Sequence, residues 1–181
     1  MAFLAEKTVI LGVGGGIAAY KSCELTRLLV KEGAKVHIIL TKSATQFVTP
    51  LTLQTLSLNP IHTDLFDLTQ EQEIGHIALA DKADMLVVAP ATADLIAKAA
   101  HGLANDLLTN VLLATRAKVL FCPSMNVHMW EHKATQYNVG RLKELGYKIL
   151  EPASGELACG YNGKGRLCEP EAIIQELKQL G

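Results

Sequence analysis

Thr8-Val9-Ile10-Leu11-Gly12-Val13-Gly14-Gly15-Gly16 decides the fold of this chain. The stretch begins as a short, largely β-branched apolar run, which is typical of a buried strand, and it ends in three consecutive glycines. Residues 17–31 then carry leucines at helical spacing, and Gly33 is suited to end that helix. A buried strand, a glycine turn and an amphipathic helix in this order are the opening unit of a parallel sheet.

The same alternation continues to the end of the chain. Further apolar runs predict strands at 36–40, 84–89, 118–122 and 147–150. Helical patterns predict helices at 51–57, 92–100, 106–115, about 131–145 and 171–180, and a helix beginning near His76. We therefore predict an α/β fold, a Rossmann-type, flavodoxin-like parallel sheet with helices on both faces.

Composition narrows the class of protein. The chain has 181 residues, of which 49% are hydrophobic and 19% charged, and its net charge is −1. These values predict a single domain spanning 1–181 with a substantial core, and they argue against a nucleic-acid partner held by bulk charge. No apolar stretch approaches the roughly 20 residues of a membrane helix, so no membrane association is expected. The four cysteines show no C-x-x-C spacing, which favours a cytoplasmic protein with reduced thiols.

The ends of the predicted strands indicate a ligand. Reading from Gly14, the glycine turn fits G-x-G-x-x-A, a weak dinucleotide pattern that also suits a tight turn with no ligand. The second strand ends in Thr41-Lys42-Ser43 rather than in the acid that holds a ribose diol. Hydroxyls and a cation suit a terminal phosphate, so FMN fits better than NAD. Pro123-Ser124-Met125-Asn126 adds an amide side chain and backbone donors that can bind a carboxylate.

Several other polar residues are candidates for chemistry. The imidazole of His76 suits proton transfer near neutral pH, although a lone histidine is more often structural. His128 and His132 have the spacing of a metal pair, but no third ligand follows, so no metal is predicted. Cys159 lies in a glycine-rich segment at about 152–170, which we predict to be a flap, and pairing with Cys168 is not expected.

Four segments together resemble the flavin-dependent cysteine decarboxylases, most closely the phosphopantothenoylcysteine decarboxylases of coenzyme A biosynthesis. They are residues 15–21, the segment around His76, the P-x-M-N-x-x-M-W string at 123–130, and A-C-G followed by G-x-G-R within 157–167. The two strings are specific, whereas the glycine turn alone is not. The resemblance covers essentially the whole chain.

The resemblance implies a site for non-covalent FMN. By this resemblance, FMN would contact Gly15, Gly16, Ile17, Thr41, Ser43, Ala91, Thr92, Ala93, Asp94, Ser124 and Met125. His76 would be the catalytic base, Asn126 would bind the substrate carboxylate, and Cys159 would donate a proton from the flap. Glu156 and Ala158 match flap positions that contact substrate. Two positions depart from the family pattern: Gly14 replaces a Ser or Thr, and Tyr161 replaces an Asp.

The implied reaction is the FMN-dependent decarboxylation of 4'-phosphopantothenoyl-cysteine to 4'-phosphopantetheine through a thioaldehyde and an enethiolate. Such enzymes are carboxy-lyases that form a homotrimer or homododecamer with the active site at a subunit interface. Many bacterial relatives continue into a ligase domain, whereas this sequence ends at Gly181, so we expect a stand-alone decarboxylase or an isolated domain. The alternatives are a decarboxylase of C-terminal peptide cysteines, a flavin prenyltransferase and a non-catalytic flavin-binding regulatory subunit.

Overall fold

A computed structural model describes residues 3–65, 75–158 and 160–180. Its main sheet has the order β3-β2-β1-β4-β5-β6, and every neighbouring pair is parallel. The strands are β1 (Thr8–Val13), β2 (Lys35–Leu40), β3 (Ile61–His62), β4 (Met85–Ala91), β5 (Lys118–Pro123) and β6 (Lys148–Ile149). This is the Rossmann order 3-2-1-4-5-6, and without the short β3 it becomes the flavodoxin order 2-1-3-4-5.

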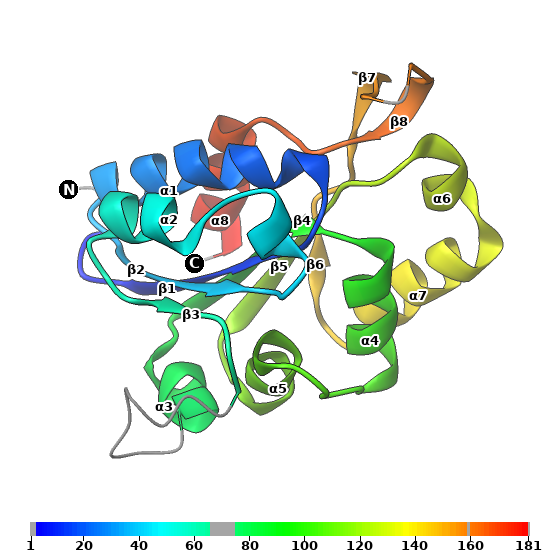
Figure 1. Cartoon of the computed structure of the whole chain (residues 1–181). Coiled ribbons are helices and arrows are strands. Elements are labelled where there is room, and N and C mark those ends of the chain that lie inside the picture. Colours follow the sequence, from blue (N-terminus) through cyan, green and yellow to red (C-terminus); the bar gives the residue numbers. More distant parts are fainter. Residues whose placement is uncertain (1–2, 66–74, 159, 181) are drawn as a thin grey trace.

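Helices cover both faces of the sheet because alternate strand residues point to opposite sides (Figure 1). On one face, Val9, Leu11 and Val13 of β1 pack in a core with apolar residues of α1 (Lys21–Lys31), α2 (Pro50–Ser57) and α8 (Pro170–Leu180). On the other face, Ile10 lies in a second core with residues of α3 (Gly75–Lys82), α4 (Ala93–His101), α5 (Leu107–Ala114) and α7 (Lys133–Glu144). The predicted α/β class is confirmed.

Two predicted helices differ in detail from the structure, and one short turn was not predicted. The helix expected at 17–31 begins as a 3-10 turn, η1 (Ile17–Tyr20), before α1. The helix expected at about 131–145 is preceded by a separate short helix, α6 (Val127–Glu131). A short 3-10 turn, η2 (Ala44–Gln46), follows β2. Each added turn lies directly after a strand end, where it redirects the chain along the edge of the sheet.

The glycine-rich segment contains a hairpin. Strands β7 (Ala153–Glu156) and β8 (Asn162–Arg166) pair in antiparallel fashion and project beyond the main sheet near α6 (Figure 1). The alternation of apolar residues that predicts a strand is missing from both, so the sequence pattern left this pair unpredicted. Among the described residues, no helix has both the length and the apolar character needed to span a bilayer.

Candidate functional site

A hollow of about 360 Å³ lies at the carboxyl edge of the sheet, beyond the ends of β1, β4 and β5. Parallel α/β sheets bind ligands at this edge, where the strand order reverses. Four separate segments form its walls, and together they contribute Gly15, Gly16, Ile17, Ala18, Pro90, Thr92, Ala93, Ser124, Met125, Asn126, Met129, Leu157, Ala158 and Gly165. The fold therefore brings the ends of three strands and the hairpin to one place.

The three glycines after β1 have different functions. Gly14 donates a backbone hydrogen bond to the carbonyl oxygen of Pro90 over 3.0 Å, and a Cβ on Gly14 would lie 2.5 Å from that same oxygen. A Cβ on Gly15 would lie 2.2 Å from the Cβ of Ser43. A Cβ on Gly16 would meet no atom within 4 Å. Packing thus requires glycine at positions 14 and 15, which explains why Gly14 replaces the Ser or Thr of the family pattern. Gly16, in contrast, leaves room in the hollow.

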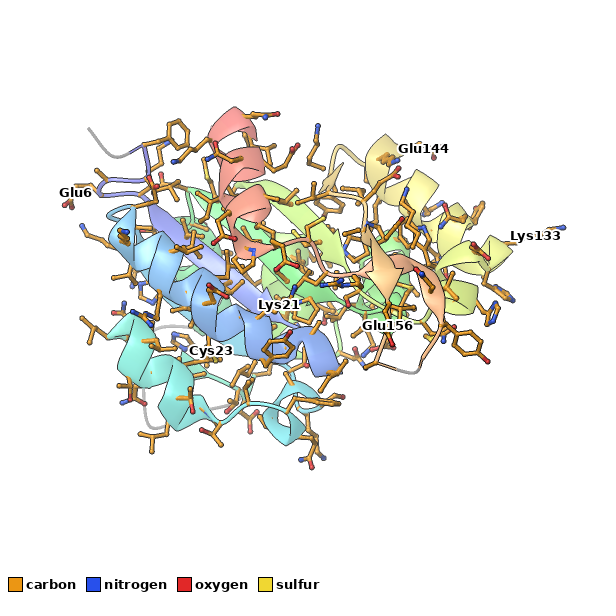
Figure 2. The ribbon with its side chains drawn as sticks, turned by 90° about the horizontal axis from the view of Figure 1, so that it is seen from above. Glu6, Lys21, Cys23, Lys133, Glu144 and Glu156 are labelled. Carbon is orange, nitrogen blue, oxygen red and sulfur yellow. The ribbon has the colours of Figure 1, made fainter. Side chains whose placement is uncertain are left out.

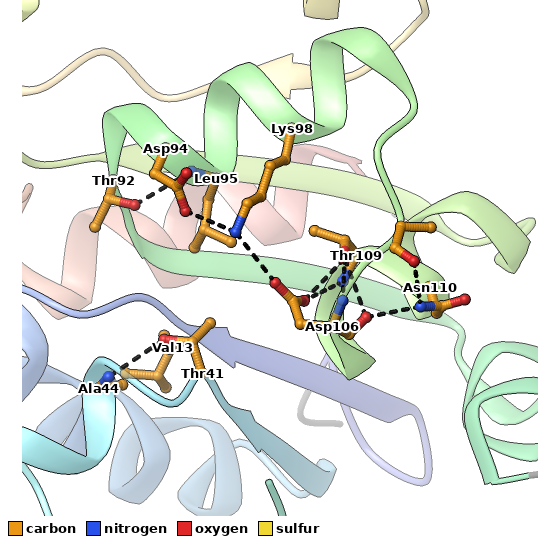
Figure 3. A network of polar contacts seen from close by, with 11 residues as sticks. Val13, Thr41, Ala44, Thr92, Asp94, Leu95, Lys98, Asp106, Thr109 and Asn110 are labelled. Carbon is orange, nitrogen blue, oxygen red and sulfur yellow. Dashed lines mark hydrogen bonds and ion pairs between the residues drawn. The ribbon is translucent and has the colours of Figure 1, made fainter. Parts of the chain in front are cut away.

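The residues after β2 support the glycine turn rather than line the hollow. The Thr41 hydroxyl donates to the Val13 carbonyl over 3.2 Å and accepts from the Ala44 N–H over 3.2 Å (Figure 3). Ser43 packs against Gly15. Both residues therefore lie beside the predicted phosphate end of the site.

The predicted cofactor-binding residues at the end of β4 have two different roles. Some line the hollow, whereas Asp94 stabilises the fold. Thr92 caps α4 by accepting from the Leu95 N–H over 3.3 Å, and Thr92 also lines the hollow with Ala93. Asp94 instead forms an ion pair with Lys98 over 2.9 Å, and Lys98 reaches Asp106 over 3.5 Å (Figure 3). The hydrogen bond to Asp94 raises the pKa of the Lys98 ammonium, which keeps this pair charged.

Ala91 and Asn126 are positioned by backbone contacts. Ala91 is fully buried, and its carbonyl accepts from the Ser124 N–H over 3.1 Å, so Ala91 positions Ser124 rather than lining the hollow. Asn126 is the N-cap of α6, where its Oδ1 accepts from the His128 N–H over 2.8 Å. This bond fixes the amide orientation and makes the NH₂ group the end turned away from the helix. A carboxylate is a suitable acceptor for such a donor.

The hairpin forms the remaining wall of the hollow. Leu157, Ala158 and Gly165 contribute to its lining, and the Met125 N–H donates to the Gly165 carbonyl over 3.0 Å. Tyr161, at the end of the hairpin, packs edge-on against His128 with ring centroids 5.0 Å apart. The residue that departs from the family pattern therefore contacts α6.

Some predicted site residues lie elsewhere. His76 is half-buried at the start of α3, which packs beside α5, and it does not line this hollow. Glu156 lines an adjoining hollow. Cys159 lies outside the described residues. The lining residues Ala18, Pro90, Met129, Leu157 and Gly165 were not predicted, although all but Pro90 belong to segments that carry the resemblance.

The two histidines at metal-pair spacing have other contacts in the structure. His132 is the N-cap of α7, where its Nδ1 accepts from the Ala134 N–H over 3.2 Å, and His128 contacts Tyr161. Within residues 3–65, 75–158 and 160–180, no group of three or more His, Cys, Asp or Glu side chains is arranged to hold a metal ion.

The profile of the flavoprotein family matches residues 3–180. The chain belongs to the flavoprotein family. This flavoprotein is 43% identical to the probable phosphopantothenoylcysteine decarboxylase of Streptococcus mutans, over 96% of its own length and 98% of that protein. It is 51% identical to the coenzyme A biosynthesis bifunctional protein CoaBC of Bacillus subtilis, over 95% of its own length and 42% of that protein. The chain thus spans less than half the length of the bifunctional relatives that it matches.

Solved structures show the same architecture. The flavoprotein superimposes with a TM-score of 0.86 and 30% identity on a cysteine-to-serine variant of PPC decarboxylase complexed with pantothenoylaminoethenethiol, covering 96% of this chain and 97% of that one. Its TM-score with the FMN-dependent cysteine decarboxylase SpaF is 0.83 at 32% identity, covering 98% of each chain. The resemblance inferred from the sequence and the predicted fold are therefore confirmed.

Proposed function

We propose that the chain is an FMN-dependent decarboxylase that converts 4'-phosphopantothenoyl-cysteine to 4'-phosphopantetheine in coenzyme A biosynthesis. One observation carries this proposal: a single hollow at the carboxyl edge of the sheet joins the glycine turn, the amide of Asn126 and the hairpin. The similarity to decarboxylases over nearly the whole chain supports it. The similarity to the FMN-dependent cysteine decarboxylase SpaF supports FMN as the cofactor. A peptide ending in cysteine remains the alternative substrate.

The residues of the hollow fit FMN. Ile17 and Met125 offer apolar surface for a flat ring system, and Gly16 leaves room for close approach. Thr41 and Ser43 flank the glycine turn, where a terminal phosphate can meet backbone donors at the start of a helix. When bound, FMN supplies a reversible two-electron acceptor, which allows decarboxylation without net oxidation.

The chain's own groups bind the substrate and transfer protons. The Asn126 amide is neutral, so it orients the substrate carboxylate without the strong ground-state stabilisation that a cation would give. His76 is proposed as the base for the cysteine carbon and thiol protons. Cys159 is proposed as the acid that protonates the product. Cys159 falls between Leu157 and Tyr161, whose backbone groups hydrogen-bond over 2.8 Å at the end of the hairpin. We propose that this hairpin is the flap that covers the substrate.

Self-association completes the proposed site. His76 does not line the hollow of its own chain, so we propose that it serves the site of a neighbouring copy in a homotrimer or homododecamer. Large apolar side chains are available for such contacts. Tyr20 is 59% exposed and Leu58 81% exposed, and both line a groove of about 960 Å³ between α1 and α2. Burying this surface between copies would stabilise an assembly.

Mass spectrometry of 4'-phosphopantothenoyl-cysteine incubated with the FMN-loaded protein tests the proposal. We expect a product lighter by one CO₂ at the oxidation level of a cysteamine. Unchanged substrate with retained flavin would contradict this substrate, and a peptide ending in cysteine would then be assayed. Failure to bind flavin would contradict the proposed site itself.

We further infer that the reaction takes place in the cytoplasm. Cys23, Cys122 and Cys168 are all free thiols, as a reducing compartment would leave them. Burial raises the pKa of each of these thiols, which favours the protonated thiol over the thiolate near neutral pH.

A further inference from the structure

A second hollow, of about 550 Å³, adjoins the first. The two share Ile17, Ala18, Ser124, Leu157 and Ala158 as lining residues. A ligand whose reacting end lies beside Asn126 can therefore extend between η1 and the hairpin into this second hollow. The proposed substrate is such a ligand, because its cysteine and its phosphate lie at opposite ends of a flexible arm.

Two cations line the second hollow. Lys21, at the start of α1, places its Nζ 2.8 Å from both carboxylate oxygens of Glu169, and its side chain is only 11% exposed. Arg166, at the end of β8, donates from Nη2 to Oε1 of the same carboxylate over 3.3 Å. Two positive groups from distant parts of the chain thus share one negative group.

The charges of this cluster favour an anion. Lys21, Arg166 and Glu169 together carry one net positive charge, and a guanidinium has five N–H donors, of which the bond to Glu169 uses one. The Glu169 side chain is 60% exposed, so it can turn into solvent when another anion arrives. Glu156 lies on the hairpin (Figure 2), and its acidic side chain lines the same hollow. An incoming anion must therefore carry enough negative charge to displace the Glu169 carboxylate from the two cations and to offset the repulsion from Glu156.

We propose that the second hollow binds the phosphomonoester end of the substrate and that Arg166 and Lys21 determine specificity for it. This inference rests on the proposed function. A phosphomonoester carries about 1.5 to 2 negative charges at pH 7, more than the single charge of Glu169. Its oxygens match the planar donor pair of a guanidinium. The carboxylate that is lost and the phosphate that is retained are then recognised in different hollows.

The test compares kcat/KM for 4'-phosphopantothenoyl-cysteine and for the same compound without phosphate. We expect Arg166→Gln to lower kcat/KM for the phosphorylated substrate by about tenfold to a hundredfold, mainly through KM, as for lost charge-assisted hydrogen bonds. The value for the substrate without phosphate should not change, which also reports that the variant is folded. Lys21→Gln should act in the same direction. Glu156→Gln should raise the preference for phosphate because it removes a repulsive charge.

Lys164→Gln is the matched control. Lys164 is a cation of the same strand, but it pairs with Glu151 and does not line the hollow. Its replacement should leave the preference unchanged. An equal loss for both substrates in Arg166→Gln, or no preference in the unaltered protein, would overturn the inference. If neither compound is decarboxylated, the proposed function fails. Calorimetry with 4'-phosphopantetheine and pantetheine then tests the phosphate site independently of catalysis. Equal affinities of the unaltered protein for the two compounds would exclude this site.

Discussion

A Cβ atom on Gly165 would lie 2.3 Å from the carbonyl oxygen of Met125, whose own N–H donates to the Gly165 carbonyl over 3.0 Å. The hairpin therefore meets the loop after β5 backbone to backbone. Because the contacted atom is a main-chain oxygen, it cannot rotate away as a side chain would. This contact sets the distance between the hairpin and the Asn126 amide.

We predict that Gly165→Ala displaces the hairpin and lowers kcat/KM by about tenfold or more, since forced overpacking costs about 1–3 kcal/mol. Steady-state kinetics measure the loss. The control is Gly140→Ala in α7, where a Cβ would meet nothing within 4 Å. That change should leave kcat/KM as it is and slightly raise Tm, because alanine favours a helix. Unaltered kinetics in Gly165→Ala would show that the close contact does not matter for turnover.

Asn126→Asp separates the capping role of this residue from its proposed chemical role. An aspartate can still accept from the His128 N–H, so Tm and flavin content should remain near their original values. The change removes the amide donor and adds a negative charge where the substrate carboxylate would bind. We expect kcat/KM to fall by about a hundredfold or more, which steady-state kinetics would measure. A variant that turns over normally would exclude Asn126 as the carboxylate ligand.

The sequence predicts most of the sheet because its long strands are apolar throughout. It does not predict β3, since Ile61–His62 is too short to produce a pattern. It also does not predict β7 and β8, because Ala153–Glu156 and Asn162–Arg166 are rich in glycine and polar residues. Contacts with the loop after β5 hold this hairpin in place, and such contacts have no local signature.

The site is predictable only in part, for a similar reason. Residues such as Gly15, Thr92 and Asn126 follow strands, and the ends of parallel strands meet at one edge. The pairing of Lys21 with Glu169 joins residues 148 positions apart. The packing of α1 against α8, which begins directly after Glu169, brings these two together. The positions of residues along the chain therefore predict the lining of the first hollow but not that of the second.

The glycine turn gives a prediction for flavin retention. Gly16 has φ of −168°, an extended conformation open to any residue, and space beside it in the hollow. Gly16→Ala should keep the Tm of the flavin-free protein but reduce the flavin that remains bound after gel filtration, measured by visible absorbance. Gly15→Ala should lower Tm as well, because its Cβ would collide with Ser43. Full flavin retention in Gly16→Ala would place the cofactor away from this turn.

Mixed assemblies test whether His76 serves a neighbouring copy. His76→Asn and Asn126→Asp should each have very low activity alone. Co-expressed and purified together through different tags, they should recover activity, because some interfaces then combine an intact His76 with an intact Asn126. Random mixing of equal amounts restores about one site in four. If no activity returns in a verified mixed assembly, His76 and Asn126 act from the same chain.

Glu151 links the hairpin to α7, and this link should depend on pH. The Glu151 carboxylate pairs with Lys164 of β8 and, over 3.5 Å, with Lys143 of α7. The hydrogen bond and charge of Lys164 hold the pKa of the Glu151 carboxyl below its usual range. A lowered pKa means that the stabilisation is present above the unfolded value, about 4.3, and is lost as pH falls through the folded value. Both partners are substantially exposed, so the effect on Tm should be small, about 2 °C or less at pH 7.

Differential scanning calorimetry across pH 3 to 7 measures this dependence. Glu151→Gln should have a lower Tm than the unaltered protein at pH 7, and the two values should converge as the pH falls below about 4. Glu144→Gln is the control, because Glu144 lies at the end of α7 and forms no salt bridge within the described residues. The difference in Tm between Glu144→Gln and the unaltered protein should be small, and it should not change with pH as the Glu151→Gln difference does. A Glu151→Gln deficit that persists unchanged at pH 3 would mean that packing, rather than the ion pair, stabilises the base of the hairpin.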